Sequence, residues 1–137
     1  MFLNLSNMKI GIVVDNNYYG DIRVRKTVDV FLEMNHDVFV LCYKFLDASD
    51  QETHCDKRVV FEKINISRRY KNFLFFFYHL LPFHKRLWKN KVSKFIDKYD
   101  LDIIFANDLY MSKSSYLGIV NSGKYIPMVL DLHENYP

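Results

Sequence analysis

The segment Lys9-Ile-Gly-Ile-Val-Val14 decides the fold, because it is a short apolar run rich in β-branched side chains. Strands that are buried on both faces of a parallel sheet have this composition, whereas half-buried strands alternate polar and apolar residues. The next seven residues, Asp15-Asn-Asn-Tyr-Tyr-Gly-Asp21, have the composition of a turn. We therefore expect a strand over residues 9–14 and a loop at its carboxyl end.

A helix and a second strand are predicted after this loop. From Ile22 onward, apolar residues recur at the spacing of one helix face, at Val24, Val28, Phe31 and Leu32. Asp21 suits the N-cap of this helix, and Asn35 suits a left-handed residue just past its end. Residues 38–42 are again apolar, which predicts a second buried strand, parallel to the first and joined to it by the helix.

The rest of the chain continues this alternation. Residues 44–57 are polar and predict a loop, and further strands are predicted over residues 58–66, 102–106 and 128–130. Helices are predicted over residues 70–83, 84–99 and 112–122, with Pro82 between the first two and Gly123 at the end of the third. Strands that alternate with helices are typical of the α/β class. We predict one Rossmann-like domain, residues 1–137, with a doubly wound parallel sheet flanked by helices.

Composition places this domain among globular proteins. Half of the 137 residues are hydrophobic and 26% are charged, which is ordinary for a soluble domain. No apolar run approaches the ~20 residues of a membrane-spanning helix, and residues 1–7 do not resemble a signal peptide. Cys42 and Cys55 form neither a disulfide framework nor a metal-binding pattern. We expect a buried, reduced thiol at Cys42 and a cytoplasmic protein.

The net charge of +3 conceals a strongly basic segment. Residues 67–94 contain eight Lys or Arg and no acid, whereas the rest of the chain contains eleven basic and sixteen acidic residues. The apolar centre of this segment, residues 73–81, fits a helix in a lipid interface, or else a buried helix beside a solvated basic one. Nucleic acid is not expected as a partner, because no DNA- or RNA-binding motif is present. We favour an anionic membrane surface, contacted by Arg68, Arg69, Lys71, Phe75, Phe76, Lys85, Arg86 and Trp88.

Titratable side chains follow two of the predicted strands. Asp108 comes after the strand over residues 102–106, and Asp131 and His133 come after the strand over residues 128–130. Ligands of open α/β sheets bind at the carboxyl ends of the strands, so these groups are expected to converge on one crevice. A histidine beside a carboxylate can act there as an acid, a base or a hydrogen-bond donor. The alternative is that the two aspartates only cap the segments that follow them.

The loop after the first strand gives a weaker signal. It contains only Gly20 where a dinucleotide-binding fold carries G-x-G-x-x-G. The helix that follows offers its N-terminal N–H groups to an anion, with Arg23 beside them, unless Arg23 is simply a surface residue. Asp15 does not fit a phospho-acceptor receiver domain, because Val14 stands where a second acid is needed. His54, in a polar loop with Cys55 and Asp56, is not expected to bind a metal.

Residues 9–41, 99–110 and 126–137, taken in this order, resemble the amino-terminal half of a GT-B glycosyltransferase of family 4. The family pattern D-x-R-V…G-H-x-V is matched by Asp21, Arg23, Val24, His36 and Val38, with Asn35 in place of the glycine. The pattern H-x-H-D after the fourth strand is matched only at Asp108, since Phe105 and Asn107 replace the histidines. The pattern Y-D-x-H-E-x-x-P after the fifth strand is matched by Asp131, His133, Glu134 and Pro137. The resemblance starts at Met8 and is weakest over residues 44–94.

The resemblance implies transfer of a sugar, with retention of configuration, from a nucleotide-diphosphate sugar to a glycan or lipid-linked acceptor, as in cell-surface polysaccharide synthesis. It implies no metal and no cofactor. A rear domain, not contained in these 137 residues, would bind most of the donor. By resemblance, His133 is the catalytic residue that contacts the donor sugar. The resemblance implies donor-side roles for Asn16, Asn17, Gly20 and Arg23, and acceptor-side roles for Asp108, Asp131 and Glu134.

Two functions are consistent with these features. The chain is either the acceptor-side half of a glycosyltransferase, inactive without its donor domain, or a non-catalytic module that recruits a separate catalytic subunit to the membrane. A reading frame that continues past Pro137 for ~200 residues as a second α/β domain would favour the first. In both cases we expect a cytoplasmic protein at the inner face of the plasma membrane.

Overall fold

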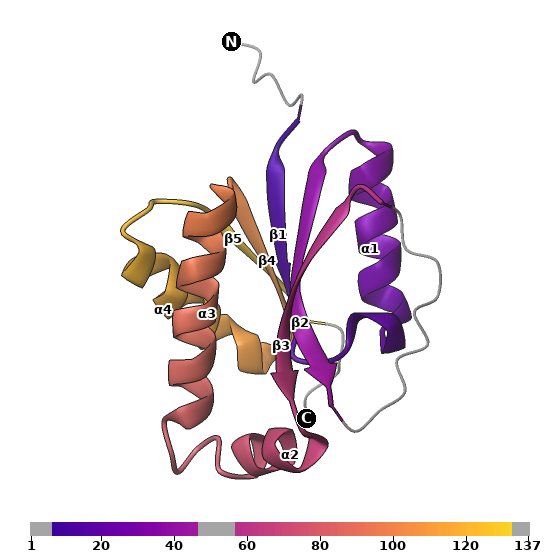
Figure 1. Ribbon diagram of the computed structural model, residues 1–137. Helices are drawn as coiled ribbons and strands as arrows, with labels where there is room; N and C mark the ends of the chain where they lie inside the picture. The colour runs from indigo at the N-terminus through magenta and orange to yellow at the C-terminus, as the bar shows by residue number, and fades with distance from the viewer. Residues whose placement is uncertain (1–6, 47–56, 133–137) are drawn as a thin grey trace.

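The computed structural model describes residues 7–46 and 57–132, which form a five-stranded parallel sheet with helices on both faces (Figure 1). The strands are β1 (Lys9–Val13), β2 (Asp37–Phe45), β3 (Val59–Ile66), β4 (Ile103–Asn107) and β5 (Met128–Asp131). The helices are η1 (Tyr18–Gly20, a single 3₁₀ turn), α1 (Ile22–Glu33), α2 (Arg68–Phe76), α3 (Phe83–Tyr99) and α4 (Leu109–Ser122). The strand order is β3-β2-β1-β4-β5, and all four pairings are parallel. The predicted Rossmann-like α/β fold is confirmed.

The strand β1 lies at the centre of the sheet, between β2 and β4. Ile12 and Val14 belong to the hydrophobic cluster beneath α1, whereas Val13 belongs to the cluster beneath α3 and α4. All three side chains are fully buried. The β-branched run at residues 9–14 thus contributes to the core on both faces of the sheet, as its composition predicts.

The two helical layers differ in size. On one face, α1 buries Val24, Val28 and Leu32 at helical spacing. On the other face, α3 and α4 pack together over β1, β2 and β4 (Figure 1). Asp21 caps α1, and Asn35 after its end has a φ of 60°, so both predicted ends of this helix are confirmed. Cys42 is buried, as expected.

The parallel arrangement brings every strand's carboxyl end to one edge of the sheet. The helix α2 crosses the same end of the molecule, below the carboxyl ends of β2 and β3 (Figure 1). The loop predicted to begin at residue 44 begins later, because β2 continues to Phe45, which pairs with Ile66 and is buried. Residues 47–56, including His54, Cys55 and Asp56, lie outside the described residues.

Two predicted helices have different bounds. The helix expected over residues 70–83 begins at Arg68, because the Ser67 side chain accepts a hydrogen bond from the Tyr70 N–H at 3.2 Å and so caps it earlier. It ends at Phe76 and is followed by turns, although the apolar sequence continues to residue 81. The helix expected from residue 112 begins at Leu109, directly after β4. None of the helices in the described part of the chain has the length and apolar character that crossing a bilayer requires.

Gly118 sets the distance between α3 and α4. A Cβ at this position would lie 2.6 Å from the Cβ of Val92 and 3.1 Å from the backbone oxygen of Lys89. Neither atom can move without displacing α3. Gly118→Ala should therefore lower the free energy of unfolding by about 1–3 kcal/mol, although alanine is the better helix former.

Urea unfolding of both this variant and Gly20→Ala tests the prediction. A Cβ at Gly20 meets no atom within 4 Å, so that variant should unfold near the wild-type midpoint. Equal midpoints for the two variants would contradict the close packing of α3 on α4.

Candidate functional site

The loops at the carboxyl edge are tied to one another by hydrogen bonds. The Asn107 Nδ2 at the end of β4 donates to the Val13 carbonyl at the end of β1 over 3.3 Å. The Asp108 N–H donates to the Asp131 carbonyl over 3.1 Å, and the Tyr43 N–H donates to the Asn16 carbonyl over 3.0 Å. The ends of β1, β2, β4 and β5 therefore form one connected edge, and the prediction that Asp108 and Asp131 lie close together is confirmed.

A buried acid–base pair lies at this edge. Asp15, just past β1, has its Oδ2 3.3 Å from the Nε2 of His84, which is in the first turn of α3. Only 10% of the Asp15 side chain and 2% of the His84 side chain are exposed. The other polar atoms of the pair, Asp15 Oδ1 and His84 Nδ1, are buried without a hydrogen-bond partner among the described residues. Because buried polar atoms are normally paired, two such atoms in one contacting pair are unusual.

Tyr43 and Trp88 extend the buried cluster. The Trp88 Nε1–H donates to the Tyr43 hydroxyl over 2.9 Å, and the two rings pack edge to face. Burial raises the pKa of Tyr43 far above its ordinary value, and the charge of Asp15 raises it further. Tyr43 therefore remains a neutral hydroxyl at every physiological pH. The cluster joins the end of β1, the end of β2 and the start of α3.

The membrane contact predicted for Trp88 is wrong, because its side chain is fully buried. Trp88 lies on the same face of α3 as His84, Val92 and Ile96, and this face packs on the sheet. The spacing of these residues, four apart, is the signal in the sequence that indicates a core position. The basic residues around Trp88 obscure that signal.

The first loop is held mainly by its own side chains. The Asn17 Oδ1 accepts from the Tyr19 N–H at 3.0 Å, and the Asn16 Oδ1 accepts from the Asn17 N–H at 2.8 Å. The Asp21 Oδ1 accepts from the backbone N–H groups of Arg23 and Val24 at 3.0 and 3.4 Å, and also lies 3.4 Å from the Arg23 Nε. A carboxylate thus already occupies the start of α1. The expectation that this helix end offers these N–H groups to an anion is wrong for the structure described.

Asp108 has a strained backbone. Its φ of 72° and ψ of 150° fall in a region that is almost restricted to glycine, which costs of order 1–3 kcal/mol. The residue precedes α4, but its side chain makes no capping hydrogen bond to that helix. Capping of α4 therefore does not explain an aspartate here, and strain of this kind is concentrated at functional sites.

The carboxyl edge is the best candidate site, although part of it lies beyond the described residues. Asp108 and Asp131 are at the edge, Asn16, Asn17 and Gly20 are in the segment between β1 and α1, and Arg23 is in the first turn of α1. His133 and Glu134 lie outside the described residues.

The sequence does not predict the contact between Asp15 and His84, because these two residues are 69 positions apart in the chain. No group of His, Cys, Asp or Glu within residues 7–46 and 57–132 could hold a metal ion.

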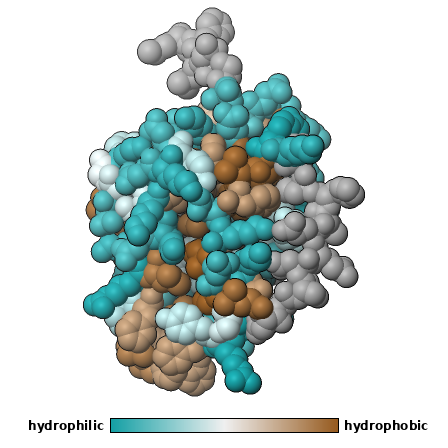
Figure 2. Space-filling model, viewed as in Figure 1, coloured by the Kyte–Doolittle hydropathy of each residue, from teal (hydrophilic) through white to brown (hydrophobic). Residues whose placement is uncertain are grey.

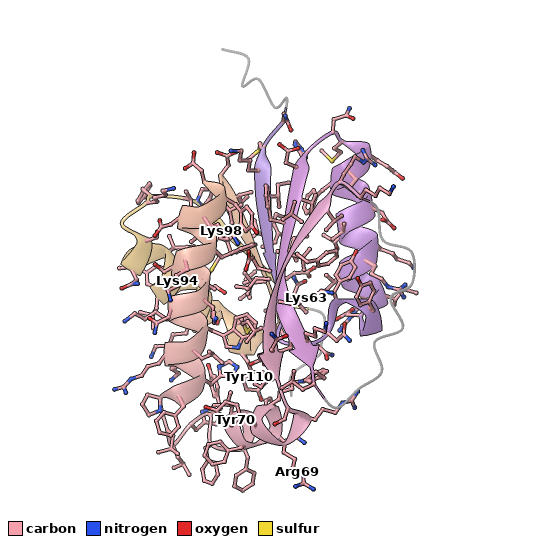
Figure 3. All side chains as sticks on the ribbon, viewed as in Figure 1. Lys63, Arg69, Tyr70, Lys94, Lys98 and Tyr110 are labelled. Atoms are coloured by element: carbon pink, nitrogen blue, oxygen red, sulfur yellow. The ribbon has the colours of Figure 1, made fainter. Side chains whose placement is uncertain are left out.

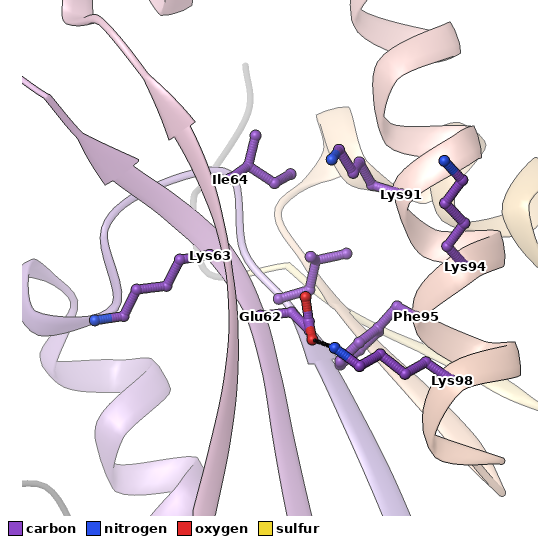
Figure 4. A pocket seen from close by; sticks show the side chains of 8 residues that line it. Glu62, Lys63, Ile64, Lys91, Lys94, Phe95 and Lys98 are labelled. Carbon is purple, nitrogen blue, oxygen red and sulfur yellow. Dashed lines mark hydrogen bonds and ion pairs between the residues drawn. The ribbon is translucent and has the colours of Figure 1, made fainter.

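A depression lies away from the carboxyl edge, between the edge strand β3 and α3 (Figure 4). It has a volume of about 190 Å³, and its charged lining comprises Glu62, Lys91, Lys94 and Lys98, whereas the side chain of Lys63 points to the other side of the sheet. Glu62 accepts hydrogen bonds from Lys98 and from the Tyr99 hydroxyl, the latter at 2.5 Å. The hydrogen bonds from Lys98 and Tyr99 lower the pKa of Glu62 below its ordinary value. The hydrogen bond to Glu62 raises the pKa of Lys98 above its ordinary value.

Comparison with known proteins gives the fold alone. No protein-family model matches the sequence, and no curated protein matches it. Two crystal structures of the C-terminal domain of a hydrogenase from Pyrococcus furiosus are similar in structure. One has a TM-score of 0.59 at 18% sequence identity, and the other a TM-score of 0.58 at 17% identity. In both cases the alignment covers 93% of this chain and 92% of the hydrogenase domain.

The buried cluster should contribute to stability. Tyr43→Phe removes the hydroxyl that accepts from Trp88, which leaves a buried N–H unpaired and should lower the free energy of unfolding by about 1–3 kcal/mol. Trp88 is the only tryptophan, so its fluorescence reports on this site during urea unfolding. Tyr125→Phe, at a fully exposed tyrosine, is the matched control. Equal midpoints for the two variants would show that the hydrogen bond is absent in solution.

The contact of Glu62 with Lys98 and Tyr99 should make stability depend on pH. Because folding lowers the pKa of Glu62, its stabilising effect is complete above the ordinary value of 4.5 and disappears as the pH falls through the lower, folded value. Glu62→Gln should therefore be less stable than the wild type at neutral pH and approach it in acid. Thermal unfolding of both proteins across this range measures the difference. A difference that stays constant with pH would contradict the assignment.

Proposed function

We propose that this chain is the acceptor-side domain of a retaining GT-B glycosyltransferase. In this proposal the enzyme transfers a sugar from a nucleotide-diphosphate sugar to a glycan or lipid-linked acceptor used in cell-surface polysaccharide synthesis. The donor domain is supplied by a further part of the protein or by a second subunit. The isolated domain binds and orients substrate but does not turn it over.

One observation carries the proposal. The three sequence segments that resemble the glycosyltransferase family are far apart in the chain, yet each contributes residues to the carboxyl edge of the same sheet, although His36 and Val38 of the first segment lie at the opposite, amino edge. Asp21 and Arg23 follow β1, Asp108 follows β4, and Asp131 ends β5. Ligands of doubly wound sheets bind beyond this edge, where the strand order reverses next to β1.

The residues then divide into an acceptor side and a donor side. The carboxylates of Asp108 and Asp131 accept hydrogen bonds from acceptor hydroxyl groups. Residues 16–20 border the donor diphosphate without enclosing it, since Asp21 already occupies the start of α1. His133, two residues after Asp131 in the sequence, contacts the donor sugar in this proposal. Donor binding in this proposal depends mainly on the second domain.

The buried pair of Asp15 and His84 has a positioning role in this proposal. It is too deeply buried to touch a sugar, because only 2% of the His84 side chain is exposed. The pair fixes the end of β1 against the start of α3, and Asp15 directly precedes the loop that borders the donor. Asp15 is also close enough to Tyr43 for its charge to raise the pKa of the Tyr43 hydroxyl, so three polar side chains meet at this end of the core.

A binding module without catalysis is the second candidate. The exposed aromatic residues of α2, such as Phe76, are consistent with such a module, although they fit a membrane-associated glycosyltransferase equally well. In that case the domain recruits a separate catalytic subunit to a membrane. The two candidates differ in one measurable respect, since only the first requires residues of this chain for turnover.

His133→Ala should reduce sugar transfer by about 100-fold or more, which is the usual contribution of a positioned acid, base or hydrogen-bond donor. The measurement uses the full-length protein, with its catalytic partner if that is separate, and a panel of labelled nucleotide sugars. Unfolding by urea should be unchanged, because residue 133 belongs to none of the described helices and strands.

Lys26→Ala, at an exposed position on α1, is the control and should leave transfer unchanged. If no nucleotide sugar serves as donor, the glycosyltransferase proposal fails. If transfer is found but His133→Ala retains near-normal turnover, transfer stands and the second candidate is favoured.

A further inference from the structure

An exposed apolar tip projects from the domain at α2 and the turns that follow it. Six large side chains between residues 70 and 83 are at least 39% exposed, and Phe76 and Leu80 are 77% exposed. Figure 2 shows hydrophobic side chains gathered at the end of the molecule where α2 lies. We call residues 68–83 the tip. Contiguous apolar surface of this kind marks an interaction site.

The tip is assembled before it meets a partner. Tyr70 stacks on Phe73 with ring centroids 6.1 Å apart, and Phe77 packs against both Phe73 and Phe76 at 4.8 and 5.0 Å. Leu74 is the one buried residue of α2 and anchors it to the core. A preformed surface loses little conformational entropy when it binds.

Cations surround the tip and acids are absent from its sequence. Residues 67–94 contain eight Lys or Arg and no Asp or Glu. Arg69 projects from α2 away from the body of the domain (Figure 3), and Arg86 is exposed in the first part of α3. The helix α3 also begins without a side-chain cap and without an acid in its first turn. The positive end of its dipole therefore adds to the positive electrostatic potential of the tip.

We propose that the tip docks on an anionic lipid bilayer, with its aromatic and aliphatic side chains among the acyl chains and its cations at the headgroups. An apolar surface rimmed by Lys and Arg is the arrangement found in interfacial helices. Each Lys or Arg near the surface adds about 1 kcal/mol of attraction to anionic lipid. The inference depends on the tip alone and holds whether or not the chain acts in a glycosyltransferase.

A protein partner or a nucleic acid fits these residues less well. Lysine is depleted in protein interfaces, and their cores contain few charged residues, whereas residues 67–94 contain eight Lys or Arg. Nucleic acid binds basic surfaces through aromatic rings that stack on bases. Here the most exposed apolar residues include the aliphatic Leu80, and Phe73 and Phe76 already pack on Phe77.

Docking would also set the orientation of the candidate site. The tip contacts the start of α4, because Phe75 and Tyr78 both pack on Tyr110, which is two residues past Asp108. The Tyr78 hydroxyl donates to the Tyr110 carbonyl over 3.4 Å. The carboxyl edge and the tip thus lie at the same end of the molecule, so a docked domain presents this edge to the lipid surface.

The experiment is co-sedimentation of the purified protein with vesicles of phosphatidylcholine alone and of phosphatidylcholine with phosphatidylglycerol. Binding should require phosphatidylglycerol at low salt and weaken as salt screens the headgroups. Two double variants test the electrostatic and the apolar contributions to binding separately. Arg69→Glu with Arg86→Glu, and Phe76→Ser with Leu80→Ser, should each reduce the partition coefficient by about tenfold or more.

Matched variants away from the tip control for charge and for apolar content. Lys26→Glu with Lys113→Glu changes the net charge equally, and Tyr116→Ser with Val120→Ser removes two exposed apolar side chains from α4. Both controls should bind like the wild type. Trp88 should keep its emission on binding, because docking leaves the core of α3 intact.

Three results would overturn the inference. The first is equal binding to vesicles with and without phosphatidylglycerol, and the second is wild-type binding by the tip variants. The third is an absence of vesicle binding together with a tip-dependent dimer in gel filtration, which would identify a second copy of the chain as the partner.

Discussion

The structure depends on the burial of β1 between β2 and β4. Because Ile12, Val13 and Val14 are fully buried and contribute to the core on both faces, β1 lies inside the sheet and not at its edge, and the sheet extends from it through β2 on one side and β4 on the other. The parallel direction then gathers the loops after β1, β4 and β5 at one edge. The central position of β1 therefore determines where the candidate site residues at the carboxyl edge lie, including residues that belong to no recognisable sequence motif.

The second structural constraint is the contact between this edge and α3. Asp15 and His84 hold the start of α3 against the end of β1, and Trp88 continues the contact one helical turn later through Tyr43. Since the tip precedes α3 directly, the same contacts that support the edge also fix the tip. The candidate site and the exposed apolar surface are therefore connected to each other through buried polar groups.

The sequence predicts the sheet well because its signals are local. A β-branched run, a capping aspartate at Asp21 and a left-handed Asn35 each act within a few residues of themselves. Asp15 and His84 could not be paired in advance, because their contact depends on how α3 packs on the sheet. Trp88 was misassigned for a related reason, since a core-facing stripe and a lipid-facing helix both place aromatic residues among cations. The ends of α2 depend on Ser67 and on turns that apolar composition conceals.

Hydrogen exchange of the full-length protein, with and without a nucleotide sugar that it turns over together with its acceptor, tests the central claim most directly. If the carboxyl edge is the site, the amides of residues 14–20 and 107–111 should exchange more slowly when substrates are bound. The amides of α3 that border Lys91 and Lys94 should be unaffected. Protection confined to α3 and β3, with no change at the carboxyl edge, would contradict the account.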